Sequence, residues 1–245
     1  MKVMVSMLMV LLCFTEAAAQ EEVEVEATSV EIEQGLDLEA VGELFKDSED
    51  LEEFEKSLND PDIGVNNLDL DENDDVDFIR VLEEVEGDVH LIILQAALAE
   101  EEYQDVATIE IEQNDDETYN MQIQGNEDIY GSDYYVSPAE VQVHTWPIIK
   151  TIYKPTYRPY RSPYLWGKYP KWWIRRRPVK MQVYKPRIKR YTGKTTFVLT
   201  RYNRLERIHR IKYKPRRARV IKKRTIRRKR AAKRAHPAKK RVRKK

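Results

Sequence analysis

The most specific chemical motif in the sequence is a run of acidic and amide side chains between residues 69 and 77. Oxygen-bearing side chains stand at alternate positions of this run, namely Asp69, Asp71, Asn73, Asp75 and Asp77. Ligands spaced in this way can wrap a hard cation such as Ca²⁺. Asp74 stands where a turn glycine is usual, and Arg80 stands where a bidentate glutamate closes the site. The motif therefore predicts either a calcium loop of weakened affinity or a solvated acidic turn, and no other cofactor is indicated.

A second group of side chains could bind anions. Residues 150–245 contain 39 Lys or Arg and a single acid, Glu206. Dense cations bind polyanions by releasing counterions, with little discrimination of sequence. The predicted partners are anionic polymers (envelope polysaccharide, lipopolysaccharide or extracellular nucleic acid) or an anionic membrane surface. The candidate anion-binding residues are Arg158, Arg161, Lys168, Lys171, Arg175, Arg176, Arg177, Arg227, Arg228, Lys229 and Arg230.

Aromatic rings alternate with these cations between residues 146 and 178. Frequent proline in this segment favours extended backbone over a regular helix. The rings could stack on sugars or bases, lie at a membrane surface, or pack on the acidic half of the chain with Arg stacked on them. All three interpretations remain open on the sequence. The candidate contact rings are Trp146, Tyr160, Trp166, Trp172 and Trp173.

Signals for catalysis are weak. The run Thr192-Gly193-Lys194-Thr195 imitates the end of a phosphate-binding loop, but Ile188 stands where its first glycine would fall. No GxSxG motif occurs, and Cys13, the single cysteine, lies in the N-terminal apolar segment. We therefore expect a protein that is not an enzyme. The histidines also lack metal-ligand spacing; they are His90, His144, His209 and His236.

Charge is segregated along the chain. Residues 20–149 hold 40 Asp or Glu and three basic residues, a formal charge of −37, whereas residues 150–245 carry +38. Such halves can neutralise each other, within or between molecules, or bind separate partners of opposite charge. Two functions follow as hypotheses. The first is an exported, non-catalytic polyanion-binding protein; the alternative is a structural, self-assembling envelope protein whose halves pair electrostatically.

Hydrophobic periodicity predicts the elements that would position these residues. Apolar residues at 38, 41, 44 and 45 have helical spacing, and Asp47-Ser48 offers an N-cap for a second helix with apolar residues at 51, 54 and 58. Strands are expected over 76–85 and 89–98, and then where apolar and polar residues alternate over 107–112 and 119–124. A turn signal at 86–88 separates the first two strands, and another at 114–116 separates the last two.

The expected fold is α+β, with two N-terminal helices packed on a small antiparallel β-meander of about four strands. This acidic domain should span residues 36–140, after a disordered acidic arm at 20–35. An extended aromatic and basic segment at 141–184 follows. The Lys/Arg-rich tail at 185–245 should be mostly disordered because its charges repel each other, with one possible strand at Thr195–Thr200.

Residues 1–19 have the features of a cleavable export signal. Lys2 precedes an apolar run from Val3 to Phe14, and Ala17-Ala18-Ala19 supplies the small residues of a cleavage site before Gln20. The apolar run is shorter than the ~20 residues that span a bilayer, and no later segment is apolar enough to do so. We therefore expect a periplasmic, cell-envelope or extracellular protein without a transmembrane span after cleavage, which could self-associate.

Several stretches resemble a group of exported bacterial proteins to which no activity is assigned. They are VNNLDLDENDDVDFIRVLEEVEGDVHLIILQAAL, YQDVATIEIE, GNEDIYG and the aromatic run YKPTYRPYRSPYLWGKYPKWW, within residues 36–175. The resemblance implies bacterial origin and an envelope or secreted setting. It also implies an ancestral metal loop of the DxNxDG type, from which this chain departs at Asp74.

Overall fold

The computed structural model describes residues 35–139, 142–192, 197–203, 205, 213–219 and 221–223. The predictions made for the export signal and the acidic arm (residues 1–34) lie outside these residues. So do those for Arg227, Arg228, Lys229 and Arg230. Within the described ranges, no helix combines the length and apolarity that crossing a bilayer requires.

Two short helices form where the apolar spacing predicts them. Helix α2 spans Leu38–Asp47 and helix α3 spans Leu51–Asn59. The N-cap of α3 is Asp50, whose carboxylate accepts from the backbone N–H of Glu53, and not the Asp47-Ser48 pair expected from the sequence. Ser48 instead ends α2, because its hydroxyl donates to the carbonyl of Leu44 at 2.7 Å.

The sheet has six antiparallel strands in the order β1-β2-β3-β4-β5-β6. The four expected strands are present as β1 (Phe78–Glu86), β2 (Val89–Ala99), β3 (Glu102–Gln113) and β4 (Tyr119–Gly125). The expectation of about four strands was too low, because β5 (Tyr135–Pro138) and β6 (Phe197–Thr200) extend the sheet. Strand β6 lies within the possible strand expected at Thr195–Thr200, whereas β5 was not expected, because its four residues are too few to show a periodic signal.

Strand β6 comes from the basic tail, which the sequence predicted to be mostly disordered apart from this one possible strand. Its residue Phe197 is buried against the ring of Trp146, with centroids 5.8 Å apart, and lies over Gly42 of α2. An added Cβ on Gly42 would lie 2.6 Å from the Phe197 ring, so the glycine makes this close approach possible. Apolar burial thus orders a stretch that charge repulsion alone would leave extended.

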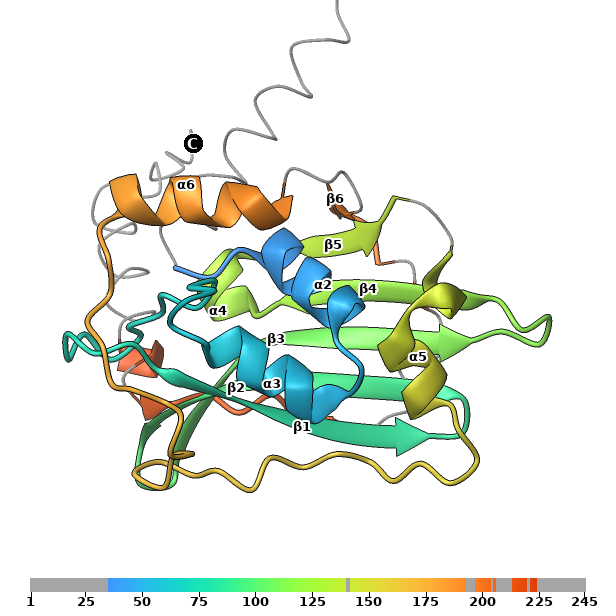
Figure 1. Ribbon diagram of the computed structural model, residues 1–245, viewed down its shortest axis with the longest axis horizontal. Coiled ribbons are helices and arrows are strands. Elements are labelled where there is room, and N and C mark those ends of the chain that lie inside the picture. Colours follow the sequence, from blue (N-terminus) through green and yellow to red (C-terminus); the bar gives the residue numbers. More distant parts are fainter. Residues whose placement is uncertain are drawn as a thin grey trace, which may run out of the picture.

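The segment after residue 140 belongs to the same hydrophobic core as the acidic domain. A short helix α4 (Glu127–Tyr130) precedes β5, and a 3-10 turn (Val143–Thr145) leads into helix α5 (Pro147–Ile152). Ile148, Ile149 and Ile152 of α5 are buried with the residues of α2, α3 and the sheet. Figure 1 shows α2, α3 and α5 in front of one sheet face, with α6 (Met181–Thr192) along the β5–β6 side.

Residues 153–180 form a long extended connection, which we call the strap. It runs along the β1 edge of the sheet and then turns up toward α6 (Figure 1). Three backbone hydrogen bonds fix it to this edge: Glu83 N–H to Tyr160, Ser162 N–H to Val81, and Val76 N–H to Arg176. The extended backbone expected from its prolines is therefore present, and it covers an edge strand whose N–H and C=O groups would otherwise be open.

Candidate functional site

The acidic domain holds the strap mainly through neutral donors. Glu83, on β1, is buried, and its Oε2 accepts the hydroxyl of Tyr157 at 2.5 Å and the backbone N–H of Tyr160 at 2.8 Å. Its other oxygen lies 2.6 Å from Nδ1 of His90. The ring of Tyr153 covers His90 with centroids 4.5 Å apart. A buried carboxylate with this many donors is satisfied without a Lys or Arg partner.

A second buried carboxylate lies farther along the same edge. Glu55 of α3 is 1% exposed, and it accepts from Val81 N–H at 2.7 Å and from the Ser162 hydroxyl at 3.1 Å. Burial raises the pKa of Glu55 to about 7, against the lowering effect of these two hydrogen bonds and of the nearby Arg80 charge. Glu55 thus joins α3, β1 and the strap, and its carboxyl titrates near neutral pH.

The rings of the strap pack on Phe78 at the start of β1. The centroids of Tyr164, Tyr169 and Trp173 lie 5.8, 5.4 and 5.7 Å from that of Phe78. Trp172 is somewhat farther away at 6.4 Å. This packing corresponds to the third interpretation of the aromatic segment, in which the rings lie on the acidic half.

The five candidate contact rings therefore differ in accessibility. Trp146 lies in the hydrophobic core, and Tyr160, Trp172 and Trp173 are half-buried. Trp166 is exposed, with 43% of its surface accessible. Among these rings, Trp166 is the one with most surface left for a partner.

The candidate cations of the strap fall into three groups. Arg161 pairs with Glu84 at 3.0 Å and Arg175 pairs with Asp75 at 3.2 Å, both on the surface. Arg176 is partly buried and donates to the carbonyls of Asn59 and Asn66, so its role is structural. The third group is exposed and forms no ion pair with another described residue; it consists of Arg158, Lys168, Lys171 and Arg177.

Helix α6 adds cations that were not among the candidates. Its inner face carries Tyr184 and Ile188, both buried, and the Tyr184 hydroxyl donates to the carbonyl of Val65 at 2.8 Å. The helix exposes Lys185, Lys189 and Arg190 to solvent. In the sequence, the helix is indicated only by the i, i+4 spacing of Tyr184 and Ile188. Pro186, which lies inside it, argues against a helix.

The candidate calcium loop forms a closed turn between α3 and β1. Asp69 accepts from the backbone N–H groups of Asn73 and Asp74 at 3.0 and 3.2 Å. Asp74 has φ of +67°, so it takes the left-handed conformation for which glycine is usual at this position. Burial raises the pKa of Asp71, with a further contribution from the neighbouring Asp69 charge.

Asp77 and Asp75, two of the five candidate calcium ligands, bind other groups of the protein. Asp77 Oδ2 accepts from the backbone N–H of Leu70 at 2.6 Å, and Asp75 bears the ion pair with Arg175. Arg80, at the closing position, is buried and points to Gln95 and to the carbonyl of Ser162. In the described part of the chain, no three His, Cys, Asp or Glu side chains are grouped to hold a metal ion.

The sheet face opposite α2 and α3 carries an apolar cluster of Leu82, Leu91 and Ile93, and Asp105 near the start of β3. Buried Asp105 accepts from the amide of Gln95 at 2.6 Å, from the hydroxyl of Tyr213 and from the backbone N–H of Arg216. Burial and the Asp105 charge raise the pKa of Tyr213. Residues 213–219 of the basic tail are thereby fixed to the first residues of β3.

Ion pairs and a stacked ring extend this attachment. Arg219 pairs with Glu102 at 2.8 Å, and Arg217 pairs with Asp128. The guanidinium groups of Arg80 and Arg216 lie 4.9 and 5.6 Å from the centre of the Tyr103 ring. The tail was predicted to be mostly disordered, but this part of it finds counter-charges on the acidic half.

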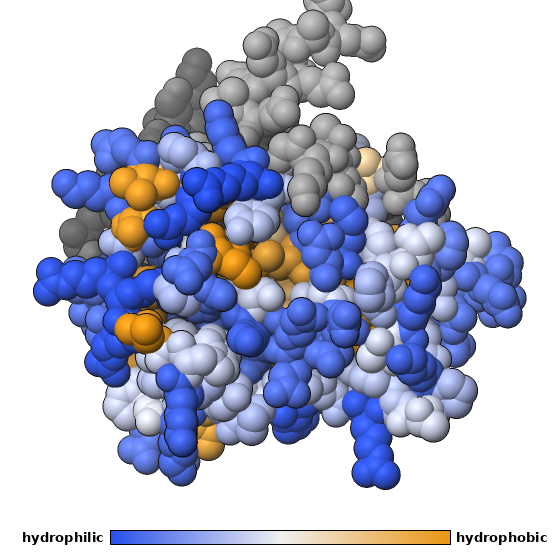
Figure 2. Space-filling view, viewed as in Figure 1, coloured by the Kyte–Doolittle hydropathy of each residue, from blue (hydrophilic) through white to orange (hydrophobic). Residues whose placement is uncertain are grey.

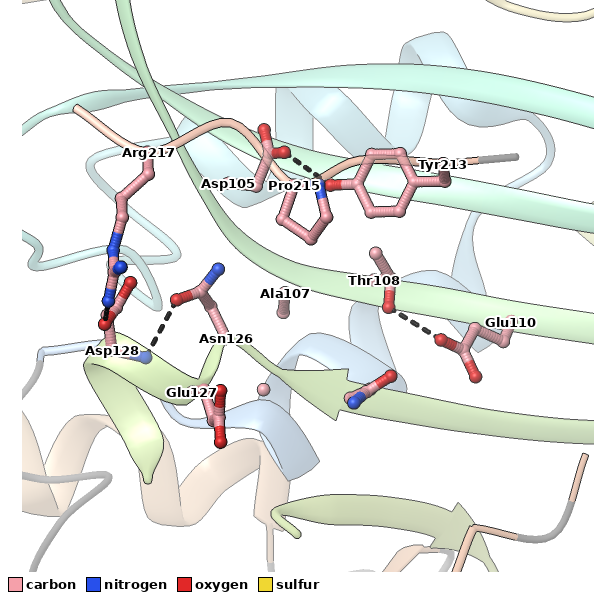
Figure 3. A pocket seen from close by; sticks show the side chains of 12 residues that line it. Asp105, Ala107, Thr108, Glu110, Asn126, Glu127, Asp128, Tyr213, Pro215 and Arg217 are labelled. Carbon is pink, nitrogen blue, oxygen red and sulfur yellow. Dashed lines mark hydrogen bonds and ion pairs between the residues drawn. The ribbon is translucent and has the colours of Figure 1, made fainter. Parts of the chain in front are cut away.

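A pocket of about 460 Å³ lies between β3, β4, α4 and this part of the tail. Figure 3 shows Asp105 bonded to Tyr213 on one side and the Arg217–Asp128 pair on another. Thr108 and Glu110 are hydrogen-bonded to each other at 3.0 Å along the floor. Four of the twelve lining residues are acidic, and the carboxylates of Asp105, Glu110 and Asp128 already bind donors of the protein itself. For the carboxylate of Glu127, no bond to another described residue is found.

Sequence reasoning missed the residues that join the two halves. Glu55, Glu83, Asp105, Tyr157 and Ser162 were not singled out. The burial of Glu83 could have been predicted, because it follows Ile79 and Val81 at alternate positions of the strand, which face the core. A carboxylate at a core-facing position of a strand is expected to be buried, and it then needs hydrogen-bond donors from elsewhere in the chain.

Comparison of the chain with family models, with curated proteins and with solved structures found no match.

Proposed function

We propose that this protein is exported and binds polyanions without catalysis, through the outward cations of the strap and α6. The observation that carries the proposal is the set of exposed cations that stay unpaired among the described residues after the halves have docked. In the strap they are Arg158, Lys168, Lys171, Arg177 and Lys180, and in α6 they are Lys185, Lys189 and Arg190.

These cations are available because of how the halves are joined. Glu83, Glu55 and Asp105 are satisfied by hydroxyl, amide and backbone donors, with His90 beside Glu83. These three buried acids therefore bind the basic half without using its Lys and Arg side chains. The surface acids Glu84, Asp75, Asp128 and Glu102 pair with four of its arginines. Exposed cations keep their counterions in solution and release them to a polyanion, which favours binding and makes it salt-dependent.

Heparin chromatography of the full chain tests the proposal. The test variant is K185Q/K189Q/R190Q, and the matched control is R161Q/R175Q/R219Q, which removes three cations that already pair with Glu84, Asp75 and Glu102. We expect the first variant to elute at clearly lower salt than wild type, and the control to shift less. Failure of wild-type protein to bind heparin near physiological salt would contradict the proposal.

Self-assembly through opposite charges is the second candidate. The acidic domain exposes carboxylates such as Glu52, Asp62 and Asp116, while α6 exposes cations, so two molecules present complementary surfaces. Pairing of this kind is screened over ~8 Å at physiological ionic strength. Light scattering at low and high salt separates the two functions: salt-reversible oligomers in the absence of any polyanion support assembly, and a constant mass counts against it.

A further inference from the structure

The strap contains one tight turn that projects apolar side chains into solvent. Leu165 and Lys168 exchange two backbone hydrogen bonds of 3.3 and 2.9 Å, which closes a two-residue turn around Trp166 and Gly167. Gly167 has φ of +74°, which a side chain would strain, and glycine is the usual residue at the third position of such a turn. Trp166 therefore stands at the corner of a defined turn.

The base of this turn is anchored in the protein. Tyr164 and Tyr169 flank it on either side, and both rings contact Phe78 of β1. Tyr169 also packs on Trp173 with centroids 4.3 Å apart. The aromatic base fixes the direction of the turn, so its exposed tip costs little further conformational entropy when it binds a partner.

The tip combines apolar and cationic side chains. Leu165 is 39% exposed and Trp166 is 43% exposed, although both are large apolar groups. Lys168 and Lys171 lie beside them in sequence, exposed and without an ion pair among the described residues. Ile174, farther along the strap, is 65% exposed. Figure 2 shows small apolar areas surrounded by strongly hydrophilic surface on the face it presents.

This composition favours a lipid surface over a soluble polyanion. A polysaccharide or a nucleic acid would use the cations and the indole ring, but an exposed leucine adds nothing to a contact with sulfate or phosphate. At a bilayer surface, the leucine, the indole ring and the lysines would each contact a different layer of the lipid. The aliphatic chain enters the acyl boundary, the indole lies at the level of the headgroups, and the lysines reach the phosphates.

We propose that the Leu165–Lys168 turn is a membrane-contact element, which inserts Leu165 and Trp166 into the surface of an anionic phospholipid bilayer. Lys168 and Lys171 contact the lipid phosphates beside it. This inference rests on the proposed function, because it assigns one class of anionic partner to the cations of the strap. It adds an apolar component of binding, which salt does not screen.

Vesicle flotation of the full chain tests the inference. The probes are vesicles of phosphatidylglycerol mixed with phosphatidylcholine and vesicles of phosphatidylcholine alone, each at low and high salt. The variant L165S/W166S is compared with V183S/Y202S, which removes two exposed apolar residues outside the turn. We expect L165S/W166S to lose at least fivefold in affinity for the anionic vesicles and all salt-resistant binding, and the control to match wild type.

A spectroscopic readout reports insertion directly. Brominated lipids quench tryptophan fluorescence only when the ring enters the bilayer, so wild type should be quenched and the W166F variant should lose most of that quenching. Thermal melts of each variant confirm that the fold is kept. Unchanged vesicle binding of L165S/W166S, or equal quenching in W166F, would overturn the inference.

Heparin chromatography in parallel separates the two proposals. A chain that binds heparin but not anionic vesicles refutes the membrane-contact turn and leaves polyanion binding standing. A chain that binds neither refutes both. We expect L165S/W166S to elute from heparin at the same salt concentration as wild type, because the substitutions remove no charge.

Discussion

Tyr157 donates its hydroxyl to Glu83 at 2.5 Å, across 74 residues of sequence. The donor lies in the basic half of the chain and the acceptor lies in the acidic half. The contact is nevertheless not an ion pair, since a neutral phenol binds a buried carboxylate. Burial and this bond both raise the pKa of Tyr157, so the phenol remains protonated.

The Tyr157–Glu83 bond should stabilise the docked strap. Tyr157→Phe leaves Glu83 with fewer donors while it stays buried, and hydrogen bonds to charged groups contribute about 1.5–3 kcal/mol. We expect the free energy of unfolding, measured in urea, to fall by about 2 kcal/mol. Tyr202→Phe, at an exposed tyrosine, is the control and should change it by less than about 0.5 kcal/mol. Equal effects of the two substitutions would show that the bond contributes nothing specific.

Glu55 should make stability depend on pH near neutrality. Its pKa is raised from 4.5 to about 7 in the folded chain by burial, so the folded state binds a proton that the unfolded state has released. Stability from this group is therefore fully present below about pH 4.5 and is lost as pH rises through 7, by about 3 kcal/mol in all.

Glu55→Gln tests that linkage. The amide can still accept from Val81 N–H and can donate to the Ser162 hydroxyl, but it does not titrate. We expect the stability of the variant relative to wild type to increase between pH 5 and pH 8 in chemical denaturation. A difference that stays constant over this range would mean that Glu55 titrates as an exposed carboxyl does.

Asp105 should control access to the attached part of the tail. Asp105→Ala removes the acceptor for Tyr213, Arg216 and Gln95, so residues 213–219 should open more often. We expect trypsin to cleave after Arg216 and Arg217 at least tenfold faster, followed by mass spectrometry, since ~1.4 kcal/mol corresponds to tenfold. The control is Asp116→Ala, at an exposed turn, where cleavage at these sites should stay at the wild-type rate.

The Asp69–Asp77 loop should respond weakly to calcium. A cation that took all five ligands would have to displace Arg175 from Asp75 and the Leu70 N–H from Asp77, and Arg80 cannot supply the bidentate ligand. We expect thermal melts in millimolar calcium and in chelator to differ by less than about 1 °C, since a site with millimolar affinity gains little from mass action. A clear rise in midpoint, abolished in Asp69→Asn, would contradict this expectation and support calcium binding by the loop.

The predicted elements that proved right are the ones with strong local periodicity. Leu38, Val41 and Phe45 repeat at the spacing of a helix, and Ile109 and Ile111 alternate with polar residues, so each pattern is read from neighbours in sequence. Strand β5 is too short for such a signal, whereas the apolar run of β6 lies within the possible strand predicted at Thr195–Thr200. The N-cap of α3 was predicted at Asp47-Ser48 because both residue types cap helices. In the structure the N-cap is Asp50, because the chain enters the helix there.

The sequence did not show which of the candidate cations and rings are accessible to solvent. Cations at Lys168 and Lys171 are exposed, yet Arg176 of the same run is partly buried among backbone carbonyls. Trp146 and Trp166 look alike in the sequence, and the first lies in the core while the second stands on a turn. Composition cannot separate such residues, because accessibility depends on what packs against each one.

The sequence by itself determined the segregation of charge, the two N-terminal helices and the four long strands, since net charge and hydrophobic period are properties of residues close together in the chain. Only the tertiary structure decided that the basic half returns to the acidic half, and that Tyr157, Ser162 and Tyr213 bind its buried carboxylates. The physical reason is that a buried carboxylate has to find donors, and which distant donors reach it is fixed by the path of the chain and the shape of the sheet edge. That choice of neutral donors is what leaves the Lys and Arg side chains of the strap and α6 exposed to solvent.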